Sequence, residues 1–199
     1  MYNSDLEERQ YTPPAATWLP VLFTIHLISL PLTFLAAVTG WRTILTWITG
    51  VLSTGSILAL FRLTPENQRY RTAAIFSCIV FFGNMINPLG GGVILSLVVS
   101  VCSIIAMYQE YVAHSELCAG IDAVLSRKWH SLFTWKLIVG LLSGFLSSAG
   151  VVIAVLVGMD SEAIVTVAVV FIGAVSAAME VFYLCYLRRL QKALPKESF

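Results

Sequence analysis

Charged residues are scarce in this sequence, at 12% of its 199 positions. A soluble globular domain has about 25%. The hydrophobic share of 58% is too large for one small soluble core to bury. The low charge content therefore argues against an ordinary soluble domain and indicates a chain that has lipid as its solvent.

Catalytic and metal-binding motifs are also missing. The sequence contains no HExxH pair, no GxSxG elbow, no paired intramembrane aspartates and no Asp-rich motif for phosphoryl transfer. Its three histidines, His26, His114 and His130, are scattered over an apolar stretch and a predicted inner surface. We therefore expect no enzymatic activity, no metal and no cofactor.

Cysteine spacing and net charge argue against two further classes of protein. The four cysteines have no CxxC spacing, so we interpret them as reduced thiols packed like small apolar side chains. The net charge of +1 gives no overall bias toward nucleic acid, and we expect none as a partner. The cysteines are Cys78, Cys102, Cys118 and Cys185.

Six apolar stretches are present instead, and a spanning helix needs about 20 such residues. They predict an all-α, polytopic integral membrane protein in which six transmembrane helices form three hairpins, with the lipid bilayer as the surrounding partner. The outer turns are short and contain Gly and Pro, whereas the inner connections carry the charge. The predicted spans are 18–39, 42–61, 72–88, 92–109, 136–158 and 163–187.

The basic residues set the orientation of these spans. Eleven of the 12 Lys and Arg fall on one side of the membrane, and only Arg42 falls on the other. By the positive-inside rule both termini are then cytoplasmic. The eleven are Arg9, Arg62, Arg69, Arg71, Arg127, Lys128, Lys136, Arg188, Arg189, Lys192 and Lys196.

The chain divides into a cytoplasmic tail (1–17), a membrane domain (18–187) and a basic cytoplasmic tail (188–199). The first tail is acidic, unlike the basic start of a signal peptide, so we expect the first span to be retained as an anchor. The absence of an N-x-S/T sequon is compatible with a bacterial cytoplasmic membrane, which is the location that we expect.

The longest connection, residues 110–135, has a helical pattern of its own. Leu117, Ile121, Leu125 and Trp129 recur at helical spacing with charged residues between them. This pattern predicts an amphipathic helix on the inner membrane surface, between spans four and five. Docking of a protein partner on that helix is the alternative interpretation.

Glu180 is the one acidic residue that these spans place well inside the membrane. Ionisable groups there are costly and usually face a partner, a cavity or a substrate path. His26 lies at the same predicted depth, since each residue is eight positions from an inner marker, Arg188 or Trp18. With Ser29 and Thr33 they are candidates for a polar pocket; the alternative is a structural hydrogen bond between spans one and six.

A second polar cluster lies at the outer end of the third span, where Asn84 and Asn87 precede Pro88 and three glycines. Unwound backbone before a Gly-rich turn can bind an ion or a solute. Asn-Pro and Gly-Gly are also ordinary signals for the end of a helix and a turn. Both interpretations stay open for these two asparagines.

Two functions fit these features. The first is a non-enzymatic structural, assembly or regulatory membrane component, which the hairpins and the predicted surface helix favour. The second is a small-solute transport or substrate-binding membrane subunit, with its polar pocket near Glu180 and His26. The few polar groups expected inside the membrane favour the first.

Overall fold

All regular structure in the described part of the chain is helical. The computed structural model describes residues 14–38, 42–86, 92–157 and 161–194, with side chains at 14–32, 47–86, 92–143, 145 and 173–194. The all-α class predicted from the sequence is confirmed. The helices are α1 (Pro14–Val38), α2 (Arg42–Arg62), α3 (Gln68–Ile86), α4 (Gly92–Ala119), α5 (Ala123–Val157) and α6 (Ser161–Ala193).

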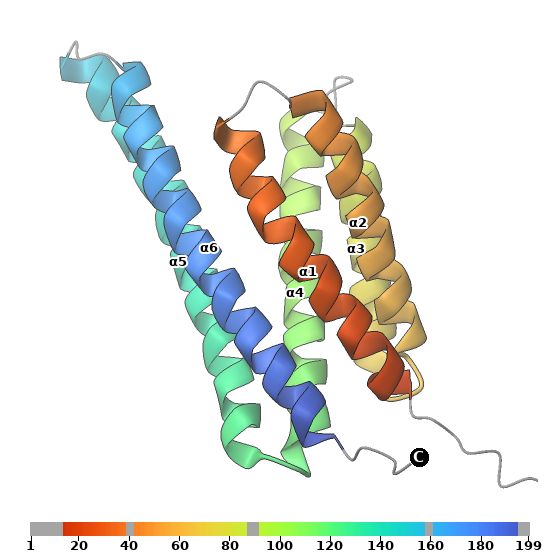
Figure 1. Cartoon of the computed structure of the whole chain (residues 1–199). Coiled ribbons are helices and arrows are strands. Elements are labelled where there is room, and N and C mark those ends of the chain that lie inside the picture. Colours follow the sequence, from red (N-terminus) through yellow and green to blue (C-terminus); the bar gives the residue numbers. More distant parts are fainter. Residues whose placement is uncertain (1–13, 39–41, 87–91, 158–160, 195–199) are drawn as a thin grey trace, which may run out of the picture.

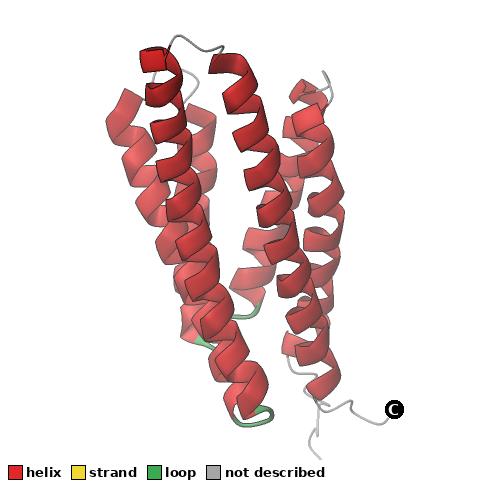
Figure 2. Cartoon of the chain, turned by 90° about the vertical axis from the view of Figure 1, so that its left-hand side faces the viewer, coloured by secondary structure: helices red, strands yellow, loops and turns green. Residues whose placement is uncertain are grey.

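The six helices lie side by side in one bundle (Figure 1), and their main contacts form a closed ring. The main contacts join each helix to the next one in the chain and join α6 back to α1. A view from the side shows the long helices aligned along one common direction (Figure 2). The connections 63–67 and 120–122 and the C-terminal end of α6 lie at the same end of the bundle, which we call the inner end (Figure 1).

Two helices are long and apolar enough to cross a membrane, among the residues whose side chains are described. They are the segment Pro14–Leu32 of α1 and the whole of α4. A third segment, Trp47–Arg62 of α2, is apolar but shorter than a span requires. The six-span topology therefore stays a prediction.

The prediction of a separate surface helix in residues 110–135 is wrong. Helix α4 continues to Ala119, a turn follows, and α5 begins at Ala123 (Figure 1). Of the four apolar residues in that pattern, Leu125 and Trp129 are fully buried in the core of the bundle, Leu117 is partly buried against it, and Ile121 is 48% exposed. Helical periodicity identifies an apolar face but does not say what covers it; here other helices cover Leu125 and Trp129.

The turn between α4 and α5 is fixed by Asp122. Its Oδ1 accepts hydrogen bonds from the backbone N–H groups of Val124 (3.0 Å) and Leu125 (2.9 Å), so it caps the N-terminus of α5. These backbone hydrogen bonds lower the pKa of the Asp122 carboxyl, and Arg189 of α6 at 3.0 Å from Oδ2 adds to the effect. Capping and pairing together hold α5 and α6 in register at the inner end.

Among the described side chains, the apolar core lies toward the inner end and draws on all six helices. Its largest fully buried side chains include Trp129 of α5, Tyr70 of α3 and Tyr183 of α6. The first and last helices also meet there, because the Gln191 side-chain amide donates to the Leu19 carbonyl at 2.9 Å.

Gly83 allows α3 and α4 to pack closely. A methyl group added at its Cα would overlap Cγ2 of Val99 on α4. Small residues let helix backbones approach closely in membrane proteins. The β-branched side chain of Val99 has little freedom to move away, so this position requires glycine.

We expect Gly83→Ala to lower the free energy of unfolding by about 1–3 kcal/mol, the usual cost of overpacking. Gly140→Ala is the matched control, because nothing lies within 4 Å of the added methyl group. Thermal unfolding in mild detergent measures both. Equal transition temperatures for the two variants would contradict the close packing of α3 on α4.

Candidate functional site

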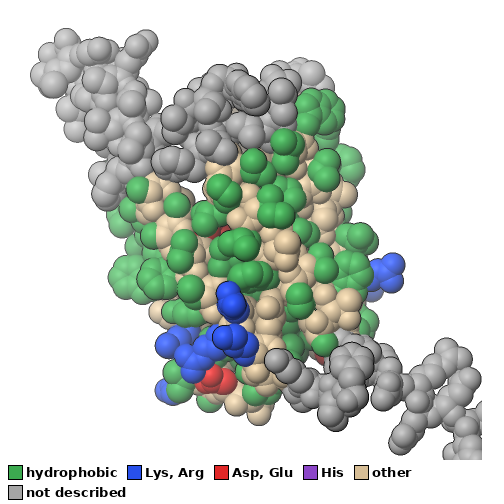
Figure 3. All heavy atoms as spheres, viewed as in Figure 1, with side chains coloured by type: hydrophobic (Ala, Val, Ile, Leu, Met, Phe, Trp, Pro, Cys, Tyr) green, Lys and Arg blue, Asp and Glu red, His purple; other side chains and the backbone are tan. Residues whose placement is uncertain are grey.

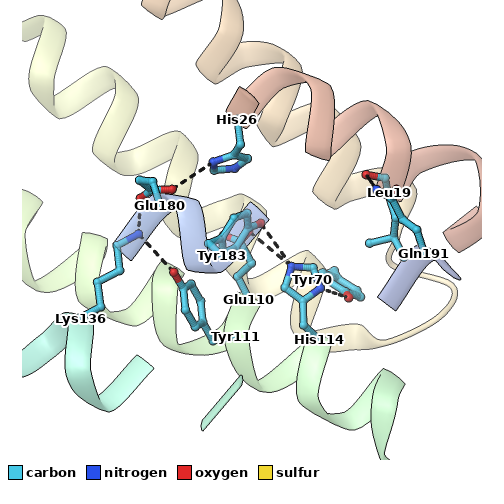
Figure 4. Close-up of polar contacts among 10 residues, drawn as sticks. All are labelled: Leu19, His26, Tyr70, Glu110, Tyr111, His114, Lys136, Glu180, Tyr183 and Gln191. Atoms are coloured by element: carbon cyan, nitrogen blue, oxygen red, sulfur yellow. Dashed lines mark hydrogen bonds and ion pairs between the residues drawn. The ribbon is translucent and has the colours of Figure 1, made fainter. Parts of the chain in front are cut away.

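Glu180 and His26 lie together between α6 and α1. Oε2 of Glu180 is 3.7 Å from Nδ1 of His26 (Figure 4). Both side chains are largely shielded, at 29% and 26% exposed. The structure thus brings together the two residues that the sequence placed at one depth.

Lys136 of α5 forms an ion pair with Oε1 of Glu180. Its Nζ also donates to the Tyr111 hydroxyl on α4, at 3.2 Å. From the sequence, Lys136 is only a marker of the inner side of the membrane. Its position in the structure makes it the principal counter-ion of Glu180, and the pair links α5 to α6 (Figure 4).

A second carboxylate, Glu110 of α4, lies beside this pair. It accepts a hydrogen bond from the Tyr183 hydroxyl on α6, at 2.5 Å. Its Oε1 is also 3.6 Å from Nε2 of His114, one helical turn along α4. Glu110 and His114 were not predicted as site residues, because both fall in the stretch that was assigned to the membrane surface. The available signal was their spacing, since a carboxylate and a histidine four residues apart share a helix face.

His114 joins Glu110 and Tyr183 to α3. Its Nδ1 is 2.7 Å from the Tyr70 hydroxyl and its Nε2 is 3.4 Å from the Tyr183 hydroxyl. The ring is fully buried, so both nitrogens depend on these partners. Burial raises the pKa of the Tyr70 phenol well above its usual value, so this hydroxyl stays protonated.

The direction of these hydrogen bonds follows from the carboxylate at one end. Glu110 only accepts, so the Tyr183 hydroxyl donates to it, and Nε2–H of His114 donates to the Tyr183 oxygen. The Tyr70 hydroxyl and Nδ1 of His114 form the last hydrogen bond, in which either atom can be the donor. A donor at Nε2 of His114 therefore completes the chain of hydrogen bonds to Glu110.

We call these eight residues the inner network (Figure 4). They come from five of the six helices, and α2 contributes none of them. Trp129 packs against the network, with its ring 4.6 Å from His114 and 5.4 Å from Tyr183. The members are His26, Tyr70, Glu110, Tyr111, His114, Lys136, Glu180 and Tyr183.

A cavity of about 740 Å³ lies between helices α1, α2, α3 and α4. Two members of the inner network, His26 and Glu110, are part of its lining. The rest of the lining mixes apolar side chains with the polar side chains Thr49, Ser53, Thr54, Ser56, Ser77, Asn84 and Ser103.

The other candidate residues are placed as follows. The Ser29 hydroxyl donates to the His26 carbonyl within α1, at 3.0 Å. Asn84 lines the cavity, whereas Glu180 and Ser29 are not among its described lining residues. The Thr33 side chain and the whole of Asn87 lie outside the described residues. The structure therefore connects His26 and Asn84 through one cavity, with Glu110 as the carboxylate that faces it.

Metal binding has no support in the described part of the chain, where no three or more His, Cys, Asp or Glu side chains are grouped to hold an ion. Comparison of the sequence and structure with protein families, characterised proteins and solved structures finds no match. The geometry of the inner network and of the cavity is therefore the basis for proposing a function.

We expect Tyr70→Phe to lower the free energy of unfolding by about 1–3 kcal/mol, because it leaves the buried Nδ1 of His114 without a partner. Tyr108→Phe is the control, since Tyr108 is 42% exposed and lies outside the network. Chemical unfolding in detergent measures both variants. A Tyr70→Phe protein as stable as the control would show that the hydrogen bond to His114 contributes nothing.

Proposed function

We propose that the chain is an integral membrane protein whose six helices all cross the bilayer, with both termini in the cytoplasm. Its described surface supports this, because large apolar side chains on α2 to α5 are 60–80% exposed. Water-soluble monomers rarely expose apolar patches of such extent. Examples are Trp47, Val51, Phe82, Ile94 and Phe145.

The distribution of charge supports the proposed orientation. Lys and Arg side chains gather over the lower part of the face in Figure 3, and apolar side chains cover the part above them. This lower part is the inner end of the bundle. Lys and Arg are enriched on the cytoplasmic side of membrane proteins. We keep the bacterial cytoplasmic membrane as the proposed location.

The topology predicts opposite labelling at two positions. In a variant without the four native cysteines, Asp122→Cys should be protected from a membrane-impermeant maleimide added to intact cells. Asp160→Cys, in the third predicted outer turn, should react. Inverted vesicles should reverse the pattern. Labelling of both cysteines from the same side would contradict the topology.

Within that membrane domain we propose that the protein binds a small solute in the cavity that α1, α2, α3 and α4 line. The main support for this proposal is the cavity itself. Its volume of about 740 Å³ falls within the usual range of ligand sites, roughly 300–1,000 Å³. Its hydroxyls, the Asn84 amide and Glu110 are convergent polar groups in a mainly apolar lining. Transport and substrate binding both need such a site.

A structural or assembly role is the second candidate. The inner network favours it, since hydrogen bonds and ion pairs among five helices stabilise a bundle whether or not a solute binds. A protein partner on residues 110–135 would have a smaller apolar surface to dock on than the sequence predicts, because Leu125 and Trp129 are fully buried while Ile121 and Val124 are 48% exposed.

A cavity-filling variant separates these two functions. Native mass spectrometry of protein released from mild detergent should show a small molecule bound to the wild type. Ser77→Phe places a large ring in the cavity and should remove that molecule. Ser100→Phe, on an exposed position outside the cavity, should retain it. A bare wild type, or a molecule that Ser77→Phe retains, would favour the structural role.

A further inference from the structure

We propose that the cavity selects an organic cation, a protonated amine on an apolar body, whose ammonium group pairs with Glu110. This inference depends on the proposed solute-binding function and adds the chemical class of the solute. It follows from the charges that face the cavity, the pairing inside the inner network, and the apolar part of the lining.

Glu110 is the one carboxylate among the described residues that line the cavity, and none of those residues is Lys or Arg. His26 is the other ionisable side chain, and it already lies 3.7 Å from Glu180. The remaining polar groups are hydroxyls and one amide, which bind ions of either sign. Glu110 is therefore the acidic group that the described lining offers to a solute, and it favours a cation.

No described Lys or Arg pairs with Glu110. Lys136 is committed to Glu180 and to the Tyr111 hydroxyl. The described partners of Glu110 are the Tyr183 hydroxyl at 2.5 Å and His114, whose Nε2 is 3.6 Å away. Because the Glu110 side chain is only 15% exposed, a carboxylate without a close Lys or Arg is costly there. A cationic solute relieves that cost, and an anionic solute increases it.

The apolar part of the lining favours a solute with an apolar body. Leu22, Ile57, Val80 and Phe81 present aliphatic and aromatic surface from three helices. Burying the apolar surface of a solute against them is favourable. A small hydrated inorganic ion would leave this surface without a partner. An amine with an aromatic or aliphatic body satisfies both parts of the cavity.

Three probes that share one apolar body test the charge selectivity. They are 2-phenylethylamine, which is protonated at neutral pH, the neutral 2-phenylethanol, and the anionic 3-phenylpropionate. We expect calorimetric titration of the wild type in detergent to show the amine binding at least tenfold more tightly than the alcohol, with the anion weakest. A charge-assisted hydrogen bond to a shielded carboxylate supplies a difference of that order.

Glu110→Gln should bring the amine and the alcohol to similar affinities. Glu116→Gln is the matched control, because Glu116 is a carboxylate of the same helix that pairs with Arg69 at 2.9 Å and lies outside the cavity lining. It should keep the full preference for the amine. A preference that survives Glu110→Gln overturns the assignment to Glu110.

The wild-type probe series stands alone if Glu110→Gln does not fold. An equal or tighter affinity for the alcohol or the anion overturns the cation selectivity and leaves solute binding intact. Failure of all three probes to bind the wild type overturns the selectivity together with the solute-binding function. Binding that Ser77→Phe does not weaken places the probes outside the cavity and overturns the inference.

Discussion

The partly buried ion pair between Lys136 and Glu180 is the interaction on which the inner end of the bundle depends. A carboxylate held between apolar helices is costly unless a counter-ion and hydrogen bonds surround it. Lys136 supplies the charge, and His26 and the Tyr111 hydroxyl complete the surroundings of the pair. Three helices besides α6 must therefore keep fixed positions to satisfy one side chain of α6. The same requirement at Glu110 adds Tyr183 and His114, and through His114 it reaches Tyr70 on α3.

This network explains how the ring of helices closes. The contact of α6 with α1 joins the two ends of the chain, and His26, with the Gln191 to Leu19 hydrogen bond, lies at that junction. On the other side, α3 approaches α4 closely at Gly83, and nearer the inner end the two helices are joined by the Arg69–Glu116 ion pair. The cavity is lined by α1, α2, α3 and α4. Helix α2 contributes apolar and hydroxyl side chains to its lining and no member of the inner network. Among the described residues, Glu110 is the carboxylate that belongs to the inner network and also lines the cavity.

Much of the fold follows from the sequence, and less of the site does. Apolar length and turn residues predicted the helices, because long apolar stretches and Gly or Pro punctuation act locally. The fate of residues 110–135 was not predictable from periodicity, because a face that contains Leu125 and Trp129 suits a lipid surface and a protein core equally well. That error also hid Glu110 and His114, which the prediction assigned to the surface.

Glu180 and His26 were found because an ionisable group in an apolar stretch stands out. Lys136 was missed because a lysine at the inner end of a span has an ordinary explanation.

The most direct test of the central role of the ion pair is a double-mutant cycle on Lys136→Met and Glu180→Gln. Each single variant leaves one charged group without its partner, whereas the double variant removes both charges. We expect both single variants to unfold more easily than the double variant in detergent, with a coupling energy of about 1–3 kcal/mol between the two sites. Additive losses, in which the double variant is the least stable of the three, would show that the two side chains do not depend on each other and would contradict the account.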